Sequence, residues 1–99
     1  MQNQLETDEI NRIVGEIANA NLSSKFVREV RTEPATDSVG REALRITIVI
    51  VPGAESKIKG DALVDTLAQI QDRLRKEGEE RFPIVEYATT KELKKSGAN

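Results

Sequence analysis

The feature that most constrains the fold of this chain is a run of alternating side chains at residues 43–51. Large apolar residues recur at every second position, which is the period of a β-strand whose two faces meet different surroundings. One face carries Leu44, Ile46, Ile48 and Ile50, and the other carries Ala43, Arg45, Thr47, Val49 and Val51. β-Branched side chains dominate the run, and such side chains pack well on a pleated surface. We therefore predict a central strand with its isoleucine face in the core, ended by Pro52 and Gly53.

Two other segments have the period of an amphipathic helix. The first has Thr7 as its expected N-cap, and its apolar stripe is Ile10, Ile13, Val14 and Ile17. The second has Asp61 as its expected N-cap and ends before Gly78, because glycine tolerates the left-handed backbone that often follows a helix. The side chains of the second helix that we expect to point inward are Leu63, Val64, Leu67, Ile70 and Leu74.

Strands are also predicted at residues 25–33 and 84–87. Pro34 cannot donate to a strand ladder, so it either closes the first of these strands or lies on a sheet edge. Residues 36–40 have the composition of a turn, and residues 89–92 match a capping box for a short final helix. The predicted class is α+β: an α-β-β-α-β-(α) two-layer sandwich, with a three-stranded mixed sheet and both long helices on one face. We expect a single domain over residues 1–99, with flexible tails at 1–6 and 96–99.

The composition limits the core and the partners. The chain has 99 residues, of which 37% are apolar, and only three aromatic residues, so the core must be aliphatic. Its 15 basic and 17 acidic residues give a net charge of -2, which favours protein or small-molecule partners over nucleic acid, because phosphate binding requires a positive surplus. Cysteine is absent, which excludes disulfides and thiolate chemistry. With no signal peptide and no long apolar run, we expect a cytoplasmic protein.

Histidine is also absent, and this removes the commonest general base at neutral pH and the commonest transition-metal ligand. Catalysis would have to use Asp37, Glu42 or Tyr87. The simpler interpretation is that Asp37 shapes a turn and that Glu77, Glu79 and Glu80 are solvated. Residues 53–60 lack the Gly-Lys-Ser/Thr sequence of a phosphate-binding loop. We therefore predict no catalytic residue, no cofactor and no metal site.

The order of elements resembles two known layouts. One is the type II KH-like fold of a small family of ribosome-maturation factors, and this resemblance implies association with RNA or the ribosome. The other is the cytoplasmic domain of cation-efflux transporters, which is similar in the glycine at position 40 followed by an alternating strand. The Gly-x-x-Gly loop of the first family and the metal-binding histidines of the second have no counterpart here, so no family residue is transferred. Residues 37–48 and 81–89 are similar to small prokaryotic proteins of unknown function.

Basic residues near the C-terminus could form one patch if a final helix folds beside the second helix. They are Arg73, Arg75, Lys76, Lys91, Lys94 and Lys95. Acidic residues are interleaved with them, and single-strand binders usually add aromatic stacking platforms. A solvated charged face is therefore the favoured interpretation.

A sheet with helices on one side leaves its second face open. Antiparallel pairing would bring Val27 near Val49 and Val51, and the third strand would add Val85 or Tyr87. Exposed together, these residues would mark an interaction site, unless the C-terminal segment folds over them. We expect a non-enzymatic protein-interaction module, a homodimeric accessory or regulatory subunit that binds itself or another protein. The alternatives are an RNA- or ribosome-associated factor and, least favoured, a small enzyme using carboxylates or Tyr87.

Overall fold

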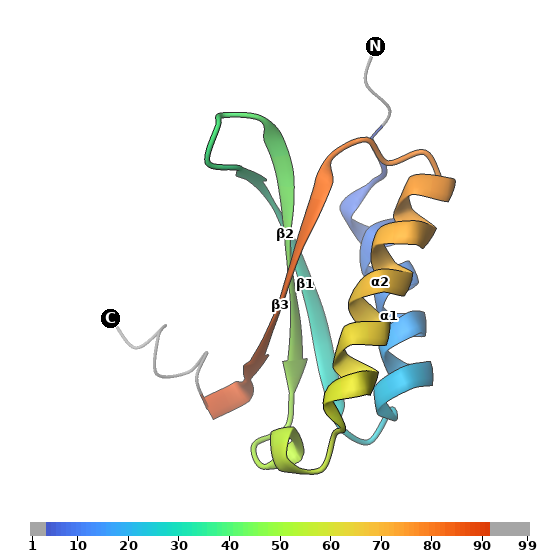
Figure 1. The fold of residues 1–99 in the computed structure, drawn as a ribbon, viewed down its shortest axis with the longest axis vertical. Helices are drawn as coiled ribbons and strands as arrows, with labels where there is room; N and C mark the ends of the chain where they lie inside the picture. Colours follow the sequence, from blue (N-terminus) through green and yellow to red (C-terminus); the bar gives the residue numbers. More distant parts are fainter. Residues whose placement is uncertain (1–3, 92–99) are drawn as a thin grey trace.

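The computed structural model describes residues 4–91 and has two layers, a pair of helices and a three-stranded sheet (Figure 1). The elements follow the order α1 (Thr7–Leu22), β1 (Val27–Thr36), β2 (Glu42–Ile50), the 3-10 turn η1 (Ala54–Ser56), α2 (Gly60–Lys76) and β3 (Phe82–Thr89). The sheet order is β1-β2-β3, with β1 antiparallel and β3 parallel to β2. Both long helices lie on the same face of the sheet. The predicted α+β class, the element order and the mixed sheet are confirmed.

The core lies between β2 and the helices, as the alternation of residues 43–51 predicts. Ile46 and Ile48 of β2 are fully buried, and Ile10, Ile13 and Ile70 of the helices are buried against this layer. Full burial of one such side chain stabilises the fold by about 1.5–3 kcal/mol. The isoleucine face of β2 therefore supplies the middle of the core.

The turn between β1 and β2 is shaped by its own side chain, as predicted. The Asp37 Oδ1 atom accepts hydrogen bonds from the backbone N–H groups of Val39, at 3.0 Å, and Arg41, at 2.9 Å. Gly40 has a φ of 86°, a left-handed backbone that other residues rarely adopt. The tip of the β1–β2 hairpin bends toward the side of the sheet opposite the helices (Figure 1). Pro34 lies within β1, which is an edge strand. The proline therefore lies on a sheet edge and does not close the strand.

The helix starts differ from the predictions. Glu6 and Lys59 occupy the N-cap positions of α1 and α2, and neither caps through its side chain. Thr7 and Asp61 lie inside the first turns, because the backbone is extended only up to the residue before each helix. The Asp61 carboxylate still opposes the positive end of the helix dipole, but it is not the cap.

The end of α2 agrees with the prediction, and one of its expected core residues does not. Gly78 has a φ of 97° directly after the C-cap residue. Val64, which was expected to point inward, is 65% exposed. At 3.6 residues per turn, Val64 lies about 100° around the helix from Leu63. The side chains of α2 that face the core are Thr66, Ile70 and Leu74.

Helical backbone begins again at Thr90 and Lys91, and the rest of the predicted final helix and of the predicted C-terminal tail lies outside the described residues. Within residues 4–91, neither helix combines the length and the apolar composition that crossing a membrane requires.

Candidate functional site

We use the name open face for the side of the sheet opposite α1 and α2. Residues that pair directly across strands share a face, so the register arranges this face in rows that run from β1 through β2 to β3. The rows are Ala35–Ala43–Phe82, Glu33–Arg45–Ile84, Arg31–Thr47–Glu86 and Glu29–Val49–Ala88. Neither long helix covers these rows (Figure 1).

The middle of the open face is charged, and its charges pair with one another. Arg31 lies 2.7 Å from Glu29 on β1, and Arg45 of β2 lies 3.9 Å from Glu86 of β3. The Thr47 hydroxyl donates to the same Glu86 carboxylate at 3.3 Å. These side chains are roughly half exposed, so each ion pair contributes at most about 1 kcal/mol to stability.

Apolar surface on the open face is concentrated at the start of β3. Phe82 is 57% exposed and Ile84, in the next row, is partly buried. By contrast, the two apolar residues of β2 on this face, Ala43 and Val49, are 1% and 0% exposed. The central strand therefore offers a partner charged and polar side chains, and β3 offers the apolar ones.

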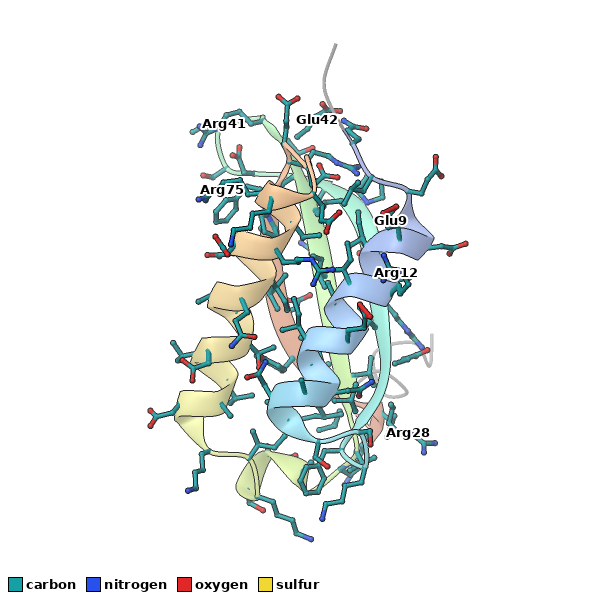
Figure 2. The ribbon with its side chains drawn as sticks, turned by 90° about the vertical axis from the view of Figure 1, so that its right-hand side faces the viewer. Glu9, Arg12, Arg28, Arg41, Glu42 and Arg75 are labelled. Atoms are coloured by element: carbon teal, nitrogen blue, oxygen red, sulfur yellow. The ribbon has the colours of Figure 1, made fainter. Side chains whose placement is uncertain are left out.

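Phe82 and Ile84 form one wall of an open groove of about 900 Å³ at the hairpin end of the sheet. The complete lining is Thr36, Asp37, Ser38, Arg41, Glu42, Glu80, Phe82 and Ile84. Figure 2 shows Arg41 and Glu42 at this end of the molecule. On the polar wall, Arg41 and Asp37 bind each other: Arg41 Nε donates to Asp37 Oδ2 at 3.0 Å. The hydrogen bond from the backbone N–H of Arg41 is the main cause that lowers the pKa of Asp37.

The structure does not bring together the five predicted contact residues. Val27, Val51, Val85 and Tyr87 pack against the core, and only Val49 lies on the open face, where it is buried. The reason is register: Val27, Val85 and Tyr87 pair with Ile50, Ile46 and Ile48, which all belong to the core face of β2. Their predicted placement in one exposed patch is wrong.

The candidate catalytic residues are also separated. Asp37 and Glu42 line the groove, whereas Tyr87 lies on the core face of β3. The Tyr87 hydroxyl donates to the backbone oxygen of Leu63 in α2 at 3.0 Å, and burial raises the pKa of this phenol. Tyr87 therefore joins β3 to α2 and does not face the groove.

One polar cluster was missed by the sequence analysis. Glu79, expected to be solvated, is 5% exposed and forms a buried ion pair with Arg81. Its Oε2 accepts hydrogen bonds from the Arg81 backbone N–H at 2.8 Å and from Arg81 Nε at 2.9 Å. Its Oε1 accepts from Arg81 Nη2 at 3.0 Å and from the Leu5 N–H at 2.8 Å. The cluster connects the segment before α1 with the segment that leads into β3.

The pKa values of this cluster follow from the same contacts. Burial acts to raise the pKa of Glu79, but the hydrogen bonds from the Arg81 side chain and from the Leu5 and Arg81 N–H groups outweigh it, so the pKa lies below its ordinary value. The hydrogen bond to Glu79 raises the pKa of Arg81. Every oxygen of the carboxylate is engaged within the protein, so the cluster is structural. Its only sequence signal is the Glu-x-Arg spacing, which is too common to have predicted a bond across 74 residues.

The basic residues near the C-terminus do not form one patch in the described part of the chain. Arg73 pairs with Glu77 and Lys76 pairs with Asp72, each at 3.0 Å along α2. Lys91 follows β3 and therefore lies at the end of the sheet opposite to the start of β3. Lys94 and Lys95 lie outside the described residues.

No protein-family model and no curated protein matches this chain. Within residues 4–91, no group of three or more acidic side chains is arranged to hold a metal ion.

Proposed function

We propose that this chain is a non-enzymatic protein-interaction module, a homodimeric accessory or regulatory subunit whose contact surface lies on the β3 side of the open face. The observation that carries the proposal is Phe82, an aromatic side chain that is 57% exposed on a face that neither long helix covers. It lies beside Ile84 and a groove of about 900 Å³. Aromatic side chains in such positions often supply most of the binding free energy at protein interfaces.

The titratable groups support a binding role over a catalytic one. The pKa shifts of Asp37, Glu79 and Tyr87 come with hydrogen bonds to the protein's own loops and helices. A general acid or base must instead reach a substrate proton at hydrogen-bond distance. The contacts that these three groups make within the protein therefore account for their pKa shifts, and no catalytic role is needed to explain them.

The proposal is tested by light scattering coupled to size-exclusion chromatography on the wild type and on Phe82→Asp. We expect the wild type to dimerise and Phe82→Asp to weaken the dimer by about 2 kcal/mol, roughly 30-fold in Kd, because a charge replaces the aromatic contact. Val39→Asp is the matched control, since Val39 is an apolar side chain that is 69% exposed but belongs to the turn between β1 and β2 and does not line the groove. A wild type that stays monomeric at high concentration overturns the homodimer. Val49→Asp is unsuitable, because Val49 is buried and its substitution would test folding.

A second candidate function, RNA association, is favoured by one observation at the opposite end of the molecule. Lys25 lies on the loop before β1, Arg28 lies at the start of β1, and Lys57 and Lys59 lie between η1 and α2. The two segments are joined by a hydrogen bond from the Val51 N–H to the Phe26 oxygen at 2.9 Å. None of the four forms an ion pair with another residue in the described part of the chain. Figure 2 shows Arg28 at this end. Salt-dependent retention on RNA that is reduced in Lys57→Glu/Lys59→Glu would support this function, and no retention at low salt would remove it.

A further inference from the structure

We infer that the homodimer forms by edge-to-edge pairing of β3 with the β3 strand of a second copy, so that two three-stranded sheets become one continuous sheet. The inference rests on the proposed function, because it takes the partner to be a second copy. It adds the element that makes the contact, the direction of the pairing and the residue on the two-fold axis.

Within residues 4–91, no strand pairs with the edge of β3 that faces away from β2. In the view of Figure 1, β3 passes in front of β2, and no other part of residues 4–91 is drawn in front of it. An edge strand presents unpaired backbone N–H and C=O groups to any strand that approaches it. Pro83, which lacks an N–H, is the second residue of the strand and leaves the remainder of the edge able to pair.

The two edges of the sheet differ in how they are protected against such pairing. Proteins usually guard exposed edges with charged side chains and prolines. β1 is guarded in this way, by Pro34 near its end and by Arg28, Glu29, Arg31 and Glu33 along its length. β3 also contains one proline, Pro83, but it carries only one charged residue, Glu86. The edge with fewer charged side chains is therefore the one more available to a partner strand.

The charge of Glu86 also selects the register. In a two-fold symmetric antiparallel pair, one residue lies opposite its own copy, and for a strand of eight residues the central choices are Val85 and Glu86. A pair centred on Glu86 would set two carboxylates against each other. A pair centred on Val85 instead sets Ile84 opposite Glu86 of the second copy, and Phe82 opposite Ala88 of the second copy. The exposed ring of Phe82 then gains an apolar neighbour.

The helix above this edge supplies a second apolar contact. Gln69 turns toward α1, where Asn21 donates to its side-chain oxygen at 3.0 Å. Val64, five residues earlier, lies about 140° around α2 from Gln69, on the side away from α1. An axis through Val85 and normal to the sheet keeps both helix layers on one side and brings the two α2 helices toward each other. Phe82 and Val64, two of the three exposed large apolar side chains in residues 4–91, thus border the same edge.

Cysteine cross-linking tests the pairing of the two β3 edges, because the chain contains no cysteine of its own. The test variant is Ile84→Cys/Glu86→Cys, whose cysteines would lie opposite each other across the two β3 strands. Directly opposed residues in antiparallel strands have Cα atoms about 4.5–5.5 Å apart, which a disulfide spans. The matched control is Arg31→Cys/Glu33→Cys, which places the same spacing on the open face of the β1 edge. The single variants Ile84→Cys and Glu86→Cys distinguish the registers. In a pair centred on Val85 neither sets its cysteine opposite its own copy, whereas Glu86→Cys does so in a pair centred on Glu86.

After mild oxidation, we expect the β3 variant to run on a non-reducing gel at twice the chain mass of 11.0 kDa and the β1 control to remain at 11.0 kDa. Light scattering on the wild type is measured in parallel. A wild-type dimer without a disulfide in the β3 variant, or with equal disulfides in both variants, overturns the edge pairing and leaves the proposed function standing. A wild-type monomer overturns the proposed homodimer and the edge pairing together.

Discussion

The two edges of the sheet are stabilised by different kinds of contact. The β1 edge is charged, and Figure 2 shows Glu9, Arg12 and Arg28 along the side formed by α1 and β1. The β3 edge is mainly apolar and is attached to the rest of the protein by buried polar contacts, the Glu79–Arg81 ion pair before its start and the Tyr87–Leu63 hydrogen bond near its end. The comparison teaches that solvated charge covers one edge, whereas the other is attached by buried polar contacts and carries little charge, which is why we propose it as the contact edge.

The largest expected effect comes from breaking the internal attachment of the β3 side. Glu79→Ala leaves the Arg81 guanidinium, 11% exposed, without its partner, and removes the acceptor of the Leu5 N–H. We expect a loss of about 3–5 kcal/mol in the free energy of unfolding, the usual cost of an uncompensated buried charge. Chemical denaturation measures it. Glu77→Ala, which breaks an exposed ion pair of α2, is the control and should cost less than about 1 kcal/mol.

The same ion pair gives the protein a specific pH dependence. The pKa of Glu79 is lower in the folded protein than its ordinary value of 4.5. The carboxylate therefore contributes stability that is fully present above pH 4.5 and is lost as the pH falls through the folded value. Denaturation between pH 7 and pH 3 should show this loss in the wild type and a smaller loss in Glu79→Gln, and equal slopes for the two proteins would contradict it.

The next effect concerns association at the two edges. Ile84 and Glu33 lie in the same row of the open face, on β3 and β1. Ile84→Glu should weaken the dimer at least tenfold, about 1.4 kcal/mol, because it sets a second carboxylate opposite Glu86 of the second copy. Glu33→Lys should leave the dimer unchanged. Sedimentation equilibrium on both variants would reveal the difference, and equal Kd values would show that the two edges do not differ in association.

A smaller effect is expected at the hydrogen bonds that join each helix to its edge strand. Tyr87→Phe removes the bond to the Leu63 oxygen, and Thr32→Val removes the 2.6 Å bond between Thr32 of β1 and Asn11 of α1. Each should lower the free energy of unfolding by about 1 kcal/mol, the net value of a typical hydrogen bond. Thermal unfolding of the two variants compares the edges directly, and a loss several times larger at one edge would show that its bond is part of a wider network.

The smallest effect is expected on the surface of β1. Arg31→Ala breaks the ion pair with Glu29, whose side chains are 59% and 47% exposed. We expect a change below about 0.5 kcal/mol, because solvent screens such pairs. A loss above 1 kcal/mol in urea denaturation would mean that the guarded edge depends on its charges for stability as well as for protection.

Much of the fold could be predicted from the sequence, and little of the surface could. The isoleucine alternation of β2 and the apolar stripe of α1 are local patterns, so they were correct without any knowledge of neighbouring segments. Val85 and Tyr87 were assigned to the wrong face. Alternation along a strand shows that side chains point to two faces, but it does not show which of the two sets packs against the helices. Glu79 was expected to be solvated, since its partner Leu5 lies 74 residues away in the chain.

The sequence by itself determined the central strand at residues 43–51, the two amphipathic helices and their order, because side-chain period and turn composition are properties of consecutive residues. The tertiary structure alone decided which residues of β1 and β3 point to solvent, because that depends on the pairing register with β2. It also decided that the exposed apolar surface of the open face lies at Phe82 and not at Val49. Register and burial arise only when segments distant in the chain meet.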